Sequence, residues 1–297
     1  MKGRRILVTG AAGQLGFPIA ADLARDNDVW GVARFTAPGA RDRLEAHGVR
    51  TAAVDLIDPD WTALPDHVDL VVHLAADLTG ADYGHALRVN AEGTGLLLSR
   101  FRDAAAALVV STTAVYDLHA DPEHRFAETD PLGDSKPLFG PTYPISKIAQ
   151  EAVARTLCRT LDLPITIARM NLSYGPNGGL PAYQLAAVLQ GRPVTVADHD
   201  TFHNPIHQHD VIASVPRLLD VASVPATIIN WAGNDTVSMR QYCAYLGELV
   251  DRPVEFEAVP RFMRSRAVDT RTQHQLIGPC ALDWRDGMRH LVDDATS

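Results

Sequence analysis

The sequence predicts an α/β fold in which a doubly wound parallel sheet is joined by a smaller, partly interleaved C-terminal lobe. Short unbroken runs of β-branched and apolar residues recur along the chain, as is typical of strands buried on both faces. Stretches with apolar residues at helical spacing separate these runs. Because strand and helix alternate, the pattern favours a parallel sheet covered by helices.

The expected elements follow one another in a regular order. The expected strands cover residues 6–9, 29–33, 49–54, 68–76, 108–110 and 165–168, with a later strand at 228–231. The expected helices cover residues 14–25, 83–107, 144–161, 180–190 and 238–250, the last with Ser238 as its N-cap.

Composition indicates a globular chain and excludes several classes of partner. The 297 residues carry a net charge of −9, which disfavours sequence-independent binding to nucleic acid or to anionic membranes. No apolar stretch approaches the roughly 20 residues that span a bilayer. Three widely spaced cysteines predict reduced thiols in a cytoplasmic protein.

A glycine-rich turn follows the first expected strand and opens the first expected helix. Gly10 suits a tight turn, Gly13 lets the backbone approach a pyrophosphate, and Gly16 allows the helix to pack closely on the sheet. The turn predicts a Rossmann-type dinucleotide-binding domain. This domain is expected to cover residues 1–167 with 204–230 returning to it, and the substrate-binding lobe to cover 168–203 and 231–297.

Tyr143 and Lys147 are the residues best suited to acid–base chemistry. Because they are four residues apart on an expected helix, they share one face. A phenol with a pKa near 10 is a poor base at neutral pH, and a neighbouring ammonium lowers that pKa. Tyr143 can then exchange a proton with a substrate oxygen.

Further motifs accompany the turn and the Tyr–Lys pair. They are His73-Leu74-Ala75-Ala76, Asn90-Ala91-Glu92-Gly93-Thr94, Ser111-Thr112-Thr113-Ala114-Val115-Tyr116, Tyr174-Gly175-Pro176 and Ile206-His207-Gln208-His209-Asp210. Taken together, these motifs resemble the extended short-chain dehydrogenase/reductase family, also called the NAD-dependent epimerase/dehydratase family. The resemblance covers nearly the whole chain. It implies a homodimer formed through the helices expected at 83–107 and 144–161.

The resemblance also implies roles for individual residues. Thr112 would be a catalytic residue together with Tyr143 and Lys147, because its hydroxyl would form a hydrogen bond to the reacting oxygen. The expected cofactor-binding residues are Gly10, Gly13, Gln14, Leu15, Gly16, Arg34, Asp55, Leu56, Leu74, Ala75, Ala76, Asn90, Ser111, Tyr143, Lys147 and Met170. The expected substrate-binding residues are Thr112, Thr113, Asn171 and His203.

Arg34 is the residue from which we predict whether the cofactor is NAD or NADP. It follows Ala33 at the end of the second expected strand, where an acidic residue would bind the ribose of NAD and an arginine accommodates the 2′-phosphate of NADP. We therefore expect a preference for NADP over NAD.

Departures from the family pattern narrow the expected reaction. Thr113 and Ala114 replace the acidic residues that family members use for elimination or decarboxylation. Leu172 and His203 replace an Asn and an Arg that bind the diphosphate of a sugar nucleotide. We therefore predict an NAD(P)-dependent oxidoreductase that acts on an alcohol or carbonyl carbon of a small molecule. The alternatives are a nucleotide-sugar 4-epimerase that uses the same residues through a transient 4-keto sugar, and a non-catalytic NADP-binding sensor.

Several histidines gather late in the chain, at His199, His203, His207 and His209, beside Asp210. Imidazole and carboxylate groups are common metal ligands. In the family that the chain resembles, however, the Ile-His-x-x-Asp pattern recurs without metal. We therefore expect no metal site here.

Overall fold

The computed structural model describes residues 1–78, 80 and 82–296, and the chain divides into two compact units. The first unit comprises Met1–Ser111, Ile145–Ala168 and Ile212–Ile229. The second comprises Thr112–Pro144, Arg169–Val211 and Asn230–Ser297. The chain therefore passes repeatedly from one unit to the other, and the allocation of particular ranges to cofactor and substrate binding stays a prediction.

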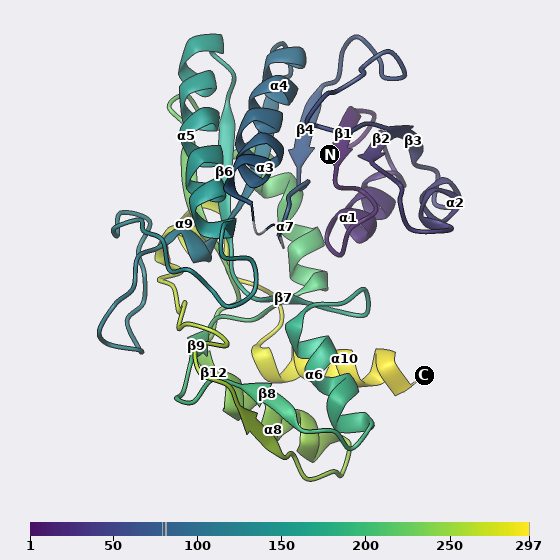
Figure 1. Ribbon diagram of the computed structural model, residues 1–297. Helices are drawn as coiled ribbons and strands as arrows, with labels where there is room; N and C mark the ends of the chain where they lie inside the picture. Colours follow the sequence, from purple (N-terminus) through teal and green to yellow (C-terminus); the bar gives the residue numbers. More distant parts are fainter. Residues whose placement is uncertain (79, 81, 297) are drawn as a thin grey trace. The chain divides into compact units, whose positions relative to one another are not determined.

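A seven-stranded parallel sheet forms the centre of the first unit (Figure 1). Its strands are β1 (Arg5–Thr9), β2 (Asp28–Ala33), β3 (Arg50–Ala53), β4 (Leu70–His73), β5 (Ala106–Thr112), β6 (Ile165–Met170) and β11 (Thr227–Trp231). Their order is β11-β6-β5-β4-β1-β2-β3. Because β1 pairs with β2 on one side and with β4 on the other, the strand order reverses there, as a doubly wound fold requires. The predicted fold class is confirmed.

Helices of the first unit cover this sheet. They are α1 (Gly16–Leu23), α2 (Ala40–Glu45), α3 (Tyr83–Leu87), α4 (Gly93–Arg100), α5 (Tyr143–Leu161) and α7 (Gln208–Asp220). Helices α4 and α5 lie side by side, and Leu97 and Ala154 from them share one core cluster with Leu7 and Val109 of the sheet. Helix α1 packs on β1 and β2. Because Ile6 and Val8 alternate with Leu7, they point to the face opposite that cluster.

One predicted helix differs markedly from the structure. The helix expected over 83–107 is three segments, α3, a π-helical turn at Arg88–Glu92 and α4, and it ends at Arg100. Ala106 and Ala107 instead begin β5 and are buried. Alanine favours helix locally, but burial in the centre of the sheet overrides that preference. Helices α2 and α7, and the last two helices of the chain described next, were not predicted.

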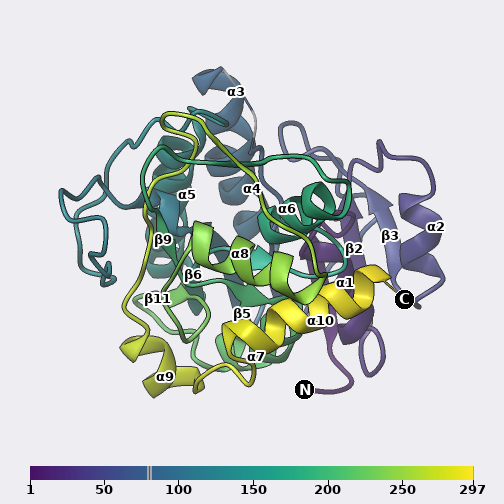
Figure 2. The ribbon, with the colours of Figure 1, turned by 90° about the horizontal axis from the view of Figure 1, so that it is seen from below.

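The second unit is built from short strands around packed helices. Its helices are α6 (Leu180–Leu189), α8 (Met239–Leu249), α9 (Arg271–Ile277) and α10 (Trp284–Thr296). Its two- or three-residue strands are β7 (Ser173–Tyr174), β8 (Val194–Val196), β9 (Phe202–His203), β10 (Ile206–His207), β12 (Val237–Ser238) and β13 (Phe256–Ala258). Helix α8 packs against α6 and α10 (Figure 2), and Leu185, Leu246 and Met288 belong to their common core. The predicted N-cap is confirmed, because the Ser238 hydroxyl accepts a hydrogen bond from Gln241 N.

Among residues 1–78, 80 and 82–296, no helix combines the length and the apolar character needed to cross a membrane.

Candidate functional site

The glycine-rich turn after β1 has the shape that a dinucleotide pyrophosphate requires. Gly10 has φ +67°, and a Cβ added there would lie 2.8 Å from the backbone nitrogen of Ala75. A Cβ at Gly16 would lie 2.0 Å from the Gly10 carbonyl oxygen. Within the described chain, no side chain caps the N-terminus of α1 and no acidic residue lies in its first turn. Its amides and dipole therefore suit an anion, so the turn fits a dinucleotide.

A buried polar chain ties this turn to the rest of the first unit. The Thr9 hydroxyl lies 2.6 Å from His73 Nδ1, and His73 Nε2 lies 2.7 Å from the Thr94 hydroxyl. Because Thr94 donates its own proton to the Asn90 carbonyl oxygen at 2.6 Å, His73 must donate from Nε2 and accept at Nδ1. Burial lowers the pKa of His73 to about 3, with a smaller effect from Lys147, so the ring is neutral.

The same chain positions the end of β4, which contributes predicted cofactor residues. The Thr9 hydroxyl oxygen accepts hydrogen bonds from the backbone amides of Leu74 and Ala75, both at 3.2 Å. Leu74, Ala75 and Ala76 are half-buried. The structure therefore brings the predicted turn and the predicted fourth-strand motif together.

Lys147 lies in α5 with its side chain only 1% exposed. Its ammonium donates a hydrogen bond to the carbonyl oxygen of Val110 in β5 at 2.7 Å. The preceding residue, Ser146, accepts a hydrogen bond from Asn90 Nδ2 at 2.8 Å. The predicted cofactor residue Asn90 thus also anchors the helix that carries Lys147.

The remaining predicted cofactor residues occupy different environments. Arg34 is exposed directly after β2, and Asp55 is exposed after β3. The ends of these strands are adjacent, because Val54 N donates to the Ala33 carbonyl oxygen. The side chain of Leu56 is buried beside Gly93. Gln14 and Leu15 are half-buried in the turn before α1, and Met170 is buried at the end of β6.

Thr112, the last residue of β5, and Tyr143, the first residue of α5, both fall in the second unit and come together there. A hydrogen bond joins their side chains, and Tyr143 is the first residue of α5, one turn before Lys147. Burial raises the pKa of Tyr143 to about 12, and the hydrogen bond from Thr112 only partly opposes this effect. The expectation of a lowered phenol pKa is therefore wrong, because desolvation outweighs the favourable hydrogen bond.

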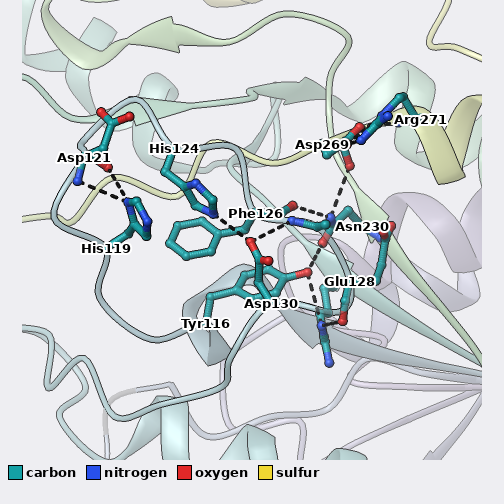
Figure 3. Close-up of polar contacts among 12 residues, drawn as sticks. Tyr116, His119, Asp121, His124, Phe126, Glu128, Asp130, Asn230, Asp269 and Arg271 are labelled. Carbon is teal, nitrogen blue, oxygen red and sulfur yellow. Dashed lines mark hydrogen bonds and ion pairs between the residues drawn. The ribbon is translucent and has the colours of Figure 1, made fainter.

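The segment that follows Thr112 is held by a second polar cluster (Figure 3). The Tyr116 hydroxyl donates to Asn230 Oδ1 at 2.5 Å, and Asn230 N donates to a carboxylate oxygen of Glu128 at 2.9 Å. His124 Nε2 lies 2.7 Å from an Asp130 oxygen. These buried and half-buried contacts fix the chain on which Thr112 lies.

The predicted substrate residue Asn171 is largely engaged by the protein itself, whereas the buried His203 Nε2 has no hydrogen-bond partner among the described residues. Asn171 Nδ2 donates to the Arg266 carbonyl oxygen at 2.6 Å and lies 3.4 Å from the Thr113 hydroxyl. Its Oδ1 accepts from the amides of Leu172 and Asn204. Burial lowers the pKa of His203 to about 3, and nearby Arg266 acts in the same direction. His203 is therefore a neutral ring, where the family pattern has an arginine.

Several buried residues around the site were not predicted. Gln150 donates to the Thr94 hydroxyl at 2.9 Å, and Glu151 accepts a hydrogen bond from Ser111 at 2.6 Å. Glu151 was detectable in principle, because it follows Lys147 by four residues on the same helix face. Gln150 carried no comparable signal.

Among the described residues, no group of three His, Cys, Asp or Glu side chains is arranged to hold a metal ion.

Known proteins resemble this chain in sequence and in structure. The dTDP-glucose 4,6-dehydratase of Neisseria meningitidis is 29% identical over 220 residues, which cover 65% of this chain and 61% of that protein. An uncharacterized UDP-glucose epimerase of Bacillus subtilis is 22% identical, with 84% of this chain and 83% of that protein covered. A crystal structure of Bacillus cereus UDP-glucuronic acid 4-epimerase, a tyrosine-to-phenylalanine variant in complex with a fluorinated UDP-glucuronic acid and NAD, superposes with a TM-score of 0.85 at 21% identity. It covers 98% of this chain and 99% of that one.

The family match extends over most of the chain and so does not depend on one motif. The NAD dependent epimerase/dehydratase family matches residues 6–227, which include the glycine-rich turn, Thr112, Tyr143 and Lys147. This chain belongs to the NAD dependent epimerase/dehydratase family.

Proposed function

We propose that the protein is an NAD-dependent nucleotide-sugar 4-epimerase. The observation that carries the proposal is the hydrogen-bonded pair of Thr112 and Tyr143, with Lys147 one helical turn further along α5. The family match and the structural likeness to a UDP-glucuronic acid 4-epimerase support epimerisation over the net oxidation or reduction that the sequence alone favoured.

The proposed reaction uses one proton-transfer group twice. Tyr143 removes the proton of the sugar 4-hydroxyl while Thr112 forms a hydrogen bond to the same oxygen. After the 4-keto sugar has rotated to present its opposite face, Tyr143 returns the proton. Lys147 supplies a positive charge that favours the phenolate, which matters because burial raises the pKa of Tyr143 to about 12. Bound NAD supplies the hydride acceptor and donor at its nicotinamide ring.

The proposed cofactor is NAD. The glycine-rich turn and α1 would hold its pyrophosphate, and Asp55 and Leu56 would lie along its adenine. The Bacillus cereus epimerase contains NAD, and nothing in the comparisons supports the NADP preference expected from Arg34. Titration of the protein with NAD⁺ and NADP⁺ tests this choice. We expect NAD⁺ to bind more tightly, and tighter binding of NADP⁺ would contradict the proposal.

Dehydration is a weaker candidate, although the Neisseria relative is a dehydratase. Elimination needs a separate acid and base near the sugar. At the positions where the family carries them, this chain has Thr113, whose hydroxyl lies near Asn171, and Ala114, which has no functional group.

Product analysis distinguishes these reactions. Purified protein is incubated with NAD⁺ and either UDP-glucose or UDP-glucuronic acid, and the products are followed by proton NMR and by absorbance at the NADH wavelength. The proposal predicts the 4-epimer of at least one sugar with no accumulation of NADH. Stoichiometric NADH would indicate a net dehydrogenase, and a 4-keto-6-deoxy product a dehydratase. Binding of NAD⁺ without turnover of either sugar would support the sensor alternative.

A further inference from the structure

Glu151 is a buried carboxylate that the proposed reaction does not use. Its side chain is 2% exposed, and it accepts a hydrogen bond from the Ser111 hydroxyl at 2.6 Å. It lies on α5 four residues after Lys147, so the two side chains share a helix face. A carboxylate that is removed from water in this way needs a compensating charge or donor.

Lys147 presents the complementary problem. It is 1% exposed, and its ammonium donates to the neutral carbonyl oxygen of Val110. Burial lowers the pKa of Lys147 to about 7, and the charge of Glu151 acts against that decrease. An ammonium in this environment is therefore only marginally stable at neutral pH.

Two other titratable groups near Lys147 are uncharged at neutral pH. His73, on β4, is neutral, because its pKa is about 3. Tyr143, one turn earlier on α5, has a pKa of about 12 and is protonated. Strand β5 contributes the Val110 carbonyl and the Ser111 hydroxyl.

We infer that Glu151, oriented by Ser111, is a positioning residue that keeps Lys147 protonated for the acid–base chemistry of Tyr143. The catalytic part of this inference, that a protonated Lys147 assists Tyr143, rests on the proposed function. The charge coupling itself does not depend on the proposed function. Removal of the Glu151 charge should leave Lys147 neutral at a pH where the unaltered protein holds a cation.

The chain allows this coupling to be measured directly, because it has only three lysines, Lys2, Lys136 and Lys147. Labelling lysine with ¹³C at Cε gives three NMR signals, and Lys147→Arg identifies that of Lys147. Lys2 and Lys136 are exposed and serve as internal references. In Glu151→Gln we expect Lys147 to lose its proton at a pH lower by about one unit or more, a tenfold loss of proton affinity.

A matched control removes a similar contact from the surface. The Glu45 carboxylate accepts a hydrogen bond from the Thr51 hydroxyl at 2.5 Å on the exposed side of the first unit. Glu45→Gln should leave the Lys147 titration unchanged. An equal titration of Lys147 in Glu151→Gln and in the unaltered protein would overturn the inference.

A second variant covers the case in which Glu151→Gln does not fold. The double substitution Lys147→Met with Glu151→Gln removes both buried charges, so we expect it to unfold at a higher temperature than Lys147→Met alone. If the double variant is no more stable than Lys147→Met, the two charges are not coupled and the inference is wrong.

The catalytic consequence is tested separately. If the protein epimerises a UDP-sugar, the alkaline limb of its pH–rate profile should move to lower pH by about one unit in Glu151→Gln, while Glu45→Gln keeps the original profile. A purely structural role for Glu151 would lower the rate at every pH without moving this limb. If the unaltered protein has no epimerase activity, the proposed function fails, and the lysine titration still decides the coupling.

Discussion

Tyr143 is the residue whose hydroxyl the proposed chemistry uses most directly. Tyr143→Phe removes the proton carrier but keeps the ring that begins α5. We expect turnover to fall by roughly 10²–10⁴-fold, the range typical of lost general acid–base catalysis, with NAD⁺ affinity within a few-fold of the original. Steady-state kinetics and calorimetric titration measure the two effects. Tyr183→Phe, at a tyrosine that is 64% exposed on α6, is the control and should change neither.

The neutral ring of His73 makes stability depend on pH. Its folded pKa is about 3, whereas an unfolded histidine titrates near 6.5. Between these values the unfolded chain binds a proton that the folded protein excludes, so stability is lost as the pH falls below about 6.5. On going from pH 7 to pH 5, His73 should account for about 2 kcal/mol of lost unfolding free energy.

Urea unfolding of the unaltered protein and of His73→Gln at the two pH values tests this expectation. The variant will be less stable at pH 7, because it breaks the chain from Thr9 to Thr94. Its further loss between pH 7 and pH 5 should be smaller by about 2 kcal/mol. Equal losses in both proteins would show that His73 is already protonated in the folded state.

At the scale of an element, the turn between β1 and α1 tolerates little change. A Cβ at Gly16 would lie 2.0 Å from the Gly10 carbonyl oxygen, which is backbone and cannot move without displacing the helix. We expect Gly16→Ala to reduce stability by about 1–3 kcal/mol and to weaken NAD⁺ binding at least tenfold. Thermal unfolding and titration with NAD⁺ measure both.

Gly84→Ala is the control for that substitution. Gly84 lies in α3, and the nearest atom to an added Cβ is 3.5 Å away in the Asp82 side chain. Alanine should be neutral or stabilising there by up to about 1 kcal/mol, since it restricts the unfolded chain. If both variants bind NAD⁺ as the unaltered protein does, the turn does not hold the pyrophosphate.

The elements that could be predicted from sequence are those that are marked by apolar residues at regular spacing or by a capping residue. Strand β1, helix α5 and helix α8 lie within one residue or so of the predicted ranges, because apolar spacing and the Ser238 cap mark them locally. The 83–107 helix breaks at a π-helical turn that contains Asn90, whose side chain donates to the distant Ser146, and no local pattern reveals this break. Helix α7 was not predicted, and it contains Pro216, a residue type that is disfavoured in the interior of a helix.

At the scale of the whole molecule, the sequence offered candidate residues for the chemistry, but not what surrounds them. Gly10, Thr112, Tyr143 and Lys147 could be proposed from sequence because their motifs are compact. The pKa of Tyr143, the engaged amide of Asn171 and the buried Glu151 depend on desolvation and on contacts between distant segments. Such effects arise only when the chain is folded, so residue types and spacing do not contain them.

Homodimerisation through the helices that include α4 and α5 stays a prediction. Leu96 on α4 is an exposed large apolar side chain, as an interface residue would be in a separated subunit.

The most direct test of the proposed reaction follows the hydrogen at carbon 4 of the sugar. UDP-glucose or UDP-glucuronic acid that carries deuterium at C4 is converted in ordinary water, and the product is examined by NMR and mass spectrometry. Because the proposed reaction removes that hydrogen from carbon 4 and returns it to the same carbon without exchange with water, the 4-epimer should keep its deuterium. A 4-epimer whose C4 deuterium has been replaced by solvent hydrogen would contradict the proposal.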